Sequence, residues 1–414
     1  MLQEGIYYQK GTTPGKHLSL IFLRLNKDKS TENIRQDIEG LWKICHELKK
    51  GRIKDLPGVD LPIESLSILI GYGKNIFSID GLNKTIPSDL NQFGSFRKPK
   101  ANGGGKLLIG SGLSYSNKVY KNVATEDIVL QFIGDTELSV SRPVVEIWKF
   151  ISDTDNDIEL SKFYKGFQRE DHRSWIDFHD GISNMKSGDE RFDAISIKPS
   201  TGLDNWTELG TYLTFIRLSV NLKEWRYLSL KEQEIAVGRM KLTGCPVEKI
   251  KDSVAFPSLG CPFTGTNSIT DKINGKYVNK SFFEPPVTVD LETRLSHVQR
   301  ANQHRSPSSS RDSLRVFRQG YEFLEHIDEY PGFSAGLNFI SFQDTPERIQ
   351  RMLTQPTWLG NTNFGGKEDD ENPKLDSLLE VLASGIYFVP PVNENESFPG
   401  EIIFKQIETA HNNV

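Results

Sequence analysis

The first third of the chain shows hydrophobic patterns typical of alternating strands and helices. Residues 18–25 form an apolar run that predicts a strand, and residues 31–50 carry apolar side chains at helical spacing. Two further apolar runs, at 66–71 and 127–133, predict strands, and residues 144–151 predict a second helix. The apolar helical positions of the first helix are Ile34, Ile38, Leu41, Trp42 and Cys45. The predicted order is therefore strand, helix, strand, strand, helix.

A coarse version of this pattern returns in the second half. Strands are predicted at 212–220 and 336–342, and helices at 229–240 and 346–353. The strand and helix order is that of ferredoxin-like domains, and no short-period sequence repeat accompanies it. We take the polar segment 152–171 as the exit from the first unit. The sequence thus predicts an α+β fold of two ferredoxin-like domains with antiparallel sheets, at residues 1–165 and 166–414.

Composition removes several classes of partner. The formal net charge of −5 gives no general attraction for a phosphate backbone, so no nucleic-acid partner is expected. No apolar run reaches the roughly 18 to 20 residues that span a bilayer, and the first residues do not resemble a secretory signal. We therefore expect no membrane partner and a cytoplasmic location. Three cysteines without a C-x-x-C spacing argue against a disulfide framework, a zinc site or covalently attached haem.

Two residue types draw attention before any family is considered. His297 is one of eight histidines and lies shortly before the segment Arg318-Gln319-Gly320-Tyr321. A lone histidine is more often structural than a metal ligand. Asp180 is followed by Gly181, and Asp-Gly is a common turn dipeptide, so neither residue alone indicates chemistry.

Several segments, taken in order, resemble the dye-decolorizing peroxidases. Residues 175–184 resemble the G-x-x-D-G signature of that family, and residues 296–302 resemble its proximal-histidine segment. Residues 318–321 are similar to its R-R-G-Y segment, and residues 336–344 to its G-L-x-F-x-x-F-Q strand. The chain departs from the family where Asp177 replaces the first glycine of the signature, and where Gly320 stands in place of an asparagine of some relatives.

The resemblance implies a haem peroxidase with a barrel-like fold of the dimeric α+β kind. One haem b per chain would lie in the C-terminal domain, with His297 as the proximal ligand of its iron. Asp180 and Arg318 would lie over the distal face and drive heterolytic cleavage of hydrogen peroxide to an oxoferryl intermediate, while Leu337 and Phe339 would line the pocket. The expected partners are hydrogen peroxide and a dye-like, phenolic or other small aromatic reductant, and a homo-oligomer is left open.

Some assignments keep two interpretations. Asp344 is either the acid partner of His297 or the N-cap of the helix that follows it. His179 competes with Asp180 for the distal position, and we favour Asp180 because adjacent side chains in an extended segment point to opposite sides. An unperturbed carboxylate titrates at about pH 4, which predicts an acidic activity optimum. Surface electron transfer could use Trp175, Trp206, Trp225 or Trp358.

Two other functions remain open at this point. A haem-binding or iron-handling protein on the same scaffold would show peroxidase activity only incidentally. A non-haem α+β binding module would have kept the fold without the cofactor.

Overall fold

The computed structural model describes most of the chain. The described residues are 1–8, 13–62, 65–93, 113–115, 118–120, 126–153, 156–182, 184–185, 187–199, 202, 204–250, 253–257, 293, 296–302, 315–353 and 378–405. Trp358 lies outside them.

The described strands form one closed barrel and two small separate sheets. The barrel strands are β1 (His17–Leu25), β2 (Ser67–Gly73), β5 (Ile128–Gly134), β6 (Ile158–Phe167), β7 (Thr211–Val220), β10 (Phe317–His326), β11 (Phe333–Gln343) and β12 (Leu379–Val389). They pair antiparallel in the order β1-β5-β2-β12-β7-β11-β10-β6, and β6 returns to β1. The small sheets pair β3 (Leu113–Tyr115) with β4 (Lys118–Tyr120), and β8 (Val247–Ile250) with β9 (Ser253–Pro257). The α+β, barrel-like fold class is confirmed.

The barrel is filled by one face of each strand. Alternate residues of a strand point to opposite faces, so a strand with apolar residues at every second position buries them on one side. The apolar cluster inside the barrel contains Phe22, Phe215, Tyr321, Phe342 and Tyr387 from different strands. Burial of these large side chains supplies much of the stability of the barrel.

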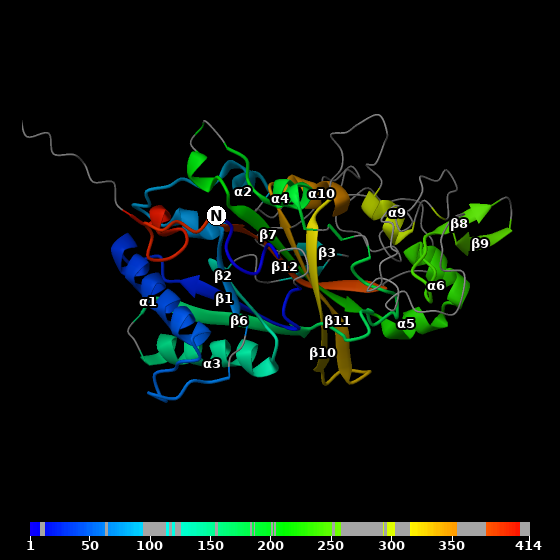
Figure 1. The fold of residues 1–414 in the computed structure, drawn as a ribbon, viewed down its shortest axis with the longest axis horizontal. Helices are drawn as coiled ribbons and strands as arrows, with labels where there is room; N and C mark the ends of the chain where they lie inside the picture. Colours follow the sequence, from blue (N-terminus) through cyan, green and yellow to red (C-terminus); the bar gives the residue numbers. More distant parts are fainter. Residues whose placement is uncertain are drawn as a thin grey trace, which may run out of the picture.

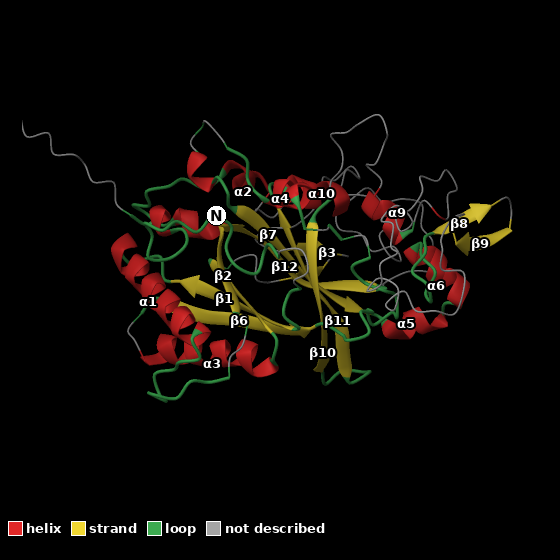
Figure 2. Cartoon of the chain, in the orientation of Figure 1, coloured by secondary structure: helices red, strands yellow, loops and turns green. Residues whose placement is uncertain are grey.

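Helices cover the outer faces of the barrel. Figure 1 places α1 (Thr31–Lys49) and α3 (Glu137–Asp153) together on one side, where both pack in a single apolar cluster with β1, β2 and β5. Figure 2 shows the remaining helices around the central strands. These are α2 (Ser88–Phe93), α4 (Asp189–Ile195), α5 (Leu222–Tyr227), α6 (Leu230–Val237), α9 (His297–Asn302) and α10 (Glu347–Leu353). No described helix is both long enough and apolar enough to cross a membrane.

The barrel has a narrow seam between β6 and β10. These two strands share a single register pair, Phe167 with Glu322, whereas β10 and β11 pair along their whole shared length. Residues 152–171, taken from the sequence as the exit from the first unit, contain the strand β6 over half of their length. Its side chains are half exposed, and a half-exposed strand has a polar sequence. The predicted domain boundary at residue 165 lies within β6, and the division into two domains stays a prediction.

The cysteines differ from each other. Cys45 is a buried free thiol of α1, and burial raises its pKa to about 12. Cys245 takes part in a disulfide bond, contrary to the expectation from the odd cysteine count.

Candidate active site

The outward face of β10 and β11 collects several of the residues singled out in the sequence. Arg318, Gly320 and Glu322 alternate along β10, and the residues between them point into the barrel. Gly320 pairs with Phe339 and Glu322 pairs with Leu337 across the two strands. Directly opposed residues of an antiparallel pair lie on the same face. The structure therefore brings Arg318, Leu337 and Phe339 onto one surface outside the barrel core.

The loop that carries Asp180 is a tight turn with an unusual backbone. Asp177 has φ of +66°, in the left-handed region that glycine adopts without strain and that aspartate adopts more often than most other residues. Its side chain lies 3.5 Å from the Nζ of Lys241, and the Asp180 amide donates to the His172 carbonyl at 3.0 Å. The exchange of glycine for Asp177 therefore preserves the turn.

Asp180 points into a cavity of about 270 Å³ at the seam. The cavity is also lined by Arg318, Gly320 and Glu322. A Cβ atom at position 320 would lie 2.9 Å from Oδ2 of Asp180, closer than side-chain carbons pack. Glycine at this position is what allows the carboxylate to rest against β10.

Arg318 is held by the same loop. The Asn184 side chain donates from Nδ2 to the Arg318 carbonyl at 2.7 Å and accepts at Oδ1 from the Arg318 amide at 3.1 Å. These two hydrogen bonds to the backbone of one residue fix the spacing between the loop of Asp180 and the strand of Arg318. The sequence alone did not identify Asn184 as a positioning residue.

His179 faces away from the cavity that Asp180 lines. It is 9% exposed, and its Nε2 lies 2.8 Å from Nη2 of Arg173. Burial and the neighbouring Arg173 and His172 lower the pKa of His179 to about 4. A neutral imidazole can accept from the guanidinium, so His179 ties the loop to Arg173.

His297 begins α9, on the outer side of the barrel. Burial is the main cause that lowers its pKa to about 4, and the charges of Arg318 and Arg239 act in the same direction. Asp180 acts in the opposite direction. These charges act on the imidazole because they lie near it, so His297, Asp180 and Arg318 share one region. At neutral pH the imidazole is uncharged, the form in which histidine binds a metal.

The end of α6 supports the His297 helix. Gly238 ends α6 with φ of +83°, and a Cβ atom there would lie 2.4 Å from Oγ of Ser296 and 2.5 Å from Cγ2 of Val298. The backbone of α6 thus contacts the residues on both sides of His297. Further along α9, Ala301 packs in the same apolar cluster as Phe339.

The chain is similar to known proteins of one family. A family model described as "Dyp-type peroxidase, C-terminal" matches residues 171–394, which include His297, Asp180 and Arg318. The chain belongs to the Dyp-type peroxidase family. A dye-decolorizing peroxidase of Thermobifida fusca (strain YX) is 23% identical over 230 residues, which are 54% of this chain and 44% of that protein. The match thus spans less than half of that relative.

Solved structures of the family share the fold along nearly the whole chain. Ferric DtpA from Streptomyces lividans has a TM-score of 0.65 at 20% identity, covering 97% of this chain and 96% of its own. The Dyp-type peroxidase from Cellulomonas bogoriensis has a TM-score of 0.63 at 17% identity, with 97% of both chains covered. A DypB variant from Rhodococcus jostii RHA1, solved in complex with heme, has a TM-score of 0.56 at 15% identity, covering 94% of this chain and 96% of its own.

Asp344 has a different partner from the one considered in the sequence. Its two carboxylate oxygens accept from Nε and Nη2 of Arg348 at 2.5 and 3.0 Å. The Glu347 amide at the start of α10 bonds to the Thr345 hydroxyl instead. Among the described charged groups, those acting most on the His297 pKa do not include Asp344. Its role beside His297 stays a prediction.

Glu322 is the acid that sequence reasoning missed. It is 5% exposed, and burial and then the charge of Asp180 raise its pKa to about 8. The available signal was its position two residues beyond Gly320. That signal has meaning only once residues 317–326 are known to form a strand.

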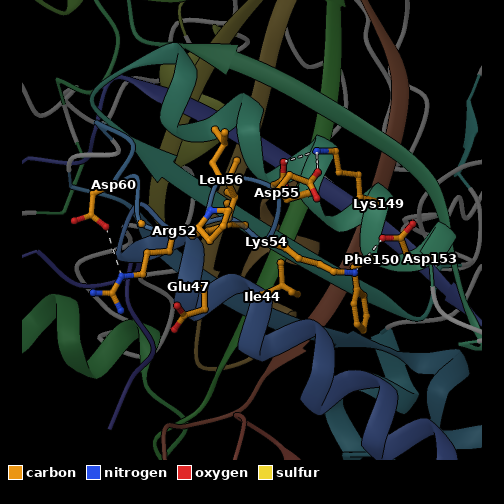
Figure 3. A pocket seen from close by; sticks show the side chains of 15 residues that line it. Ile44, Glu47, Arg52, Lys54, Asp55, Leu56, Asp60, Lys149, Phe150 and Asp153 are labelled. Carbon is orange, nitrogen blue, oxygen red and sulfur yellow. Dashed lines mark hydrogen bonds and ion pairs between the residues drawn. The ribbon is translucent and has the colours of Figure 1, made fainter.

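A larger cavity, of about 630 Å³, lies elsewhere, between the C-terminal part of α1, α3 and the loop around residues 52–60. Figure 3 shows that most of its labelled charged side chains pair with each other. Lys149 lies 2.5 Å from Asp55, and Lys54 lies 3.4 Å from Asp153. None of the residues expected in the active site lines this cavity.

Proposed function

We propose that this chain is a haem b peroxidase that uses hydrogen peroxide to oxidise dye-like, phenolic or other small aromatic donors. One haem would be bound per chain, in the C-terminal half. The observation that carries the proposal is the shared location of His297, Asp180 and Arg318, because the charges of Asp180 and Arg318, from two other segments, both act on the His297 imidazole.

The residues present fit haem. The described residues contain no group of three or more His, Cys, Asp or Glu side chains able to hold a metal ion. A single neutral histidine suits an iron whose other ligands come from a porphyrin. Leu337 and Phe339 offer apolar contacts to a flat macrocycle on the face that also carries Arg318. His297 would hold the iron.

Haem, when bound, supplies the iron centre at which the O–O bond of peroxide is cleaved and two electrons are transferred. Asp180 accepts the proton from the inner oxygen and returns it to the leaving oxygen, which requires hydrogen-bond reach to both. The cavity that Asp180 lines gives the small peroxide molecule a place beside its carboxylate. Arg318 carries a permanent positive charge that stabilises the negative charge developing on the leaving oxygen.

A set of substitutions tests this proposal. His297→Ala should abolish one-to-one haem binding in a Soret titration. Asp180→Asn should bind haem normally and slow the reaction with peroxide by about 10²- to 10⁴-fold, the usual contribution of a general acid–base group. His179→Gln, the matched control next in sequence, should react at nearly the wild-type rate because its ring bonds to Arg173.

Two outcomes would point to the other functions. A Soret band without peroxide-dependent turnover of any donor would favour a haem-binding or iron-handling protein. No haem binding at all would indicate a non-haem module that kept the fold.

A further inference from the structure

The loop that carries Asp180, residues 172–180, is closed on itself by backbone hydrogen bonds. The Ser174 amide donates to the Phe178 carbonyl at 2.9 Å, and the Asp180 amide donates to the His172 carbonyl at 3.0 Å. Because these bonds join the two ends of the loop, it behaves as one unit. The position of the Asp180 carboxylate therefore depends on what holds the loop from outside.

Two side chains anchor this loop to different parts of the molecule. After the loop, Asn184 bonds to the backbone of Arg318 and ties the chain to β10. At its start, Nη1 of Arg173 donates to the Lys241 carbonyl at 2.9 Å, and Nη2 donates to the Leu242 carbonyl at 3.4 Å. Both carbonyls belong to the segment that follows α6. The carboxylate of the loop lies between these two anchors in the chain.

The Arg173 guanidinium also bonds inside its own loop. Nη1 donates to the Asp177 carbonyl at 2.5 Å, and Nη2 lies 2.8 Å from Nε2 of His179. A guanidinium carries five donors in a planar fork, so one side chain can serve acceptors of both segments at once. The acceptors on Asp177, Lys241 and Leu242 are backbone oxygens. The connection between the segments therefore depends on the arginine and not on the side chains of these three residues.

The segment after α6 also supports the proposed iron ligand. Its first residue, Gly238, packs against the residues on both sides of His297. Glu234 of α6 accepts from the Gly238 amide at its carbonyl, at 2.7 Å, and from the Lys241 amide at Oε1, at 2.8 Å. These bonds hold residues 238–241 against the end of the helix. Arg173 therefore connects the loop of the proposed acid–base group to the segment that supports the proposed iron ligand.

We propose that Arg173 is a positioning residue of the peroxide site, which docks the loop of Asp180 on residues 238–242 and so fixes the Asp180 carboxylate relative to His297. The inference rests on the proposed function, because Arg173 acts through Asp180. Displacement of a catalytic group by about 1 Å can slow a reaction about 100-fold. Loss of the docking should slow the peroxide step more than it weakens haem binding, since His297 keeps its support from Gly238.

Amide hydrogen exchange of the haem-free protein tests the docking itself. In Arg173→Gln the hydrogen-bonded amides of Asp180 in the loop and Met240 in the segment should exchange at least about tenfold faster than in wild type. Amides of β1 should exchange as in wild type, which separates local undocking from a general loss of stability. The control Arg226→Gln removes an exposed arginine of α5 that stacks on a tyrosine ring, and it should change neither set. Unchanged exchange at Asp180 and Met240 in Arg173→Gln would overturn the docking.

The rate of the reaction with peroxide tests the functional consequence. Arg173→Gln should bind haem with nearly wild-type affinity and react about 10- to 100-fold more slowly. Arg173→Lys keeps the positive charge and loses the planar fork, so its rate should lie near that of Arg173→Gln. A rate near wild type in Arg173→Lys would mean that only the charge matters, and it would overturn the positioning role. Millimolar methylguanidinium should partly restore Arg173→Ala, whereas methylammonium should not.

A double-mutant cycle shows whether Arg173 acts through Asp180. In the Asp180→Asn background, Arg173→Gln should cause little further loss of rate, because the group that it positions is already missing. Two losses that multiply would show independent action and would overturn the inference. A wild-type chain that reacts with peroxide, beside an equally fast Arg173→Gln variant, overturns only the role of Arg173. A wild-type chain that binds no haem or does not react with peroxide overturns the proposed function and this inference together.

Discussion

Replacing Gly238 by alanine should disturb His297 from a distance. The substitution adds one methyl group at the end of α6, and it does so in two unfavourable ways. The left-handed φ of +83° costs a residue with a Cβ about 1–2 kcal/mol. The new methyl group would also lie 2.4 Å from Ser296 Oγ and 2.5 Å from Val298 Cγ2, so the start of α9 must move. Overpacking of this kind costs about 1–3 kcal/mol.

Gly58 provides a matched control. It also has a left-handed φ, of +82°, but nothing lies within 4 Å of an added Cβ. Gly58→Ala should therefore lose only the stability that the left-handed backbone costs, about 1–2 kcal/mol of the free energy of unfolding, in urea unfolding of the haem-free protein. Gly238→Ala should lose about 2–5 kcal/mol in total. The difference between the two variants isolates the contact with the His297 helix.

Haem affinity gives the functional half of the same experiment. Each 1.4 kcal/mol of binding free energy lost through displacement of the iron ligand weakens haem binding about tenfold. Gly238→Ala should therefore bind haem at least about tenfold more weakly in a spectrophotometric titration, and Gly58→Ala should bind it like wild type. Equal losses of stability and equal haem affinities in the two variants would refute the contact between α6 and the proximal segment.

Three further predictions concern the peroxide side. Asn184→Ala removes both hydrogen bonds to the Arg318 backbone and should cost about 1–3 kcal/mol of stability in urea unfolding. The variant should react more slowly with peroxide at unchanged haem affinity. An unchanged rate would show that Arg318 is held by its strand alone. Asp177→Gly should unfold at equal or higher urea concentration than wild type, because glycine adopts φ of +66° without strain and the lost ion pair with Lys241 is partly exposed; a clear loss of stability would mean that the aspartate side chain holds the turn. Glu322 has a folded-state pKa of about 8, above its unfolded value, so its contribution to stability is complete at low pH and is lost as pH rises from about 4.5 to 8. In that pH window the free energy of unfolding of wild type should fall by up to about 1.4 kcal/mol per pH unit more than that of the Glu322→Gln variant. Equal pH dependence of the free energy of unfolding in the two proteins would contradict the raised pKa.

The sequence predicts well the elements with a strong apolar pattern. The strand at 18–25 corresponds to β1, an apolar run that is buried on both faces, and the helix at 31–50 corresponds to α1, whose apolar residues face a core and whose polar residues face solvent. The helix predicted at 144–151 is shorter than α3, which begins at Glu137 and contains Pro143. Proline lowers the helical signal in the first turns.

The strands of the site were harder to predict for a physical reason. β10 was not predicted as a strand, because the residues that face the cavity are Arg318, Gly320 and Glu322, and none is favoured in strands. Family resemblance pointed to Asp180, Arg318 and His297, and the structure brings them together. Resemblance gave no information on Glu322 or Asn184, whose positions depend on strand register and loop contacts.

The position of β12 in the barrel determines how late the barrel can close during synthesis. Residues 379–389 lie between β2 and β7, and they pair with both. A ribosome makes β2 and β7 long before β12, so both strands keep an unpaired edge for most of translation. Unpaired edges invite association with other chains. Barrel closure must wait until residues 379–389 have emerged, and nascent chains arrested before residue 379 should remain sensitive to protease while chains that contain β12 become resistant.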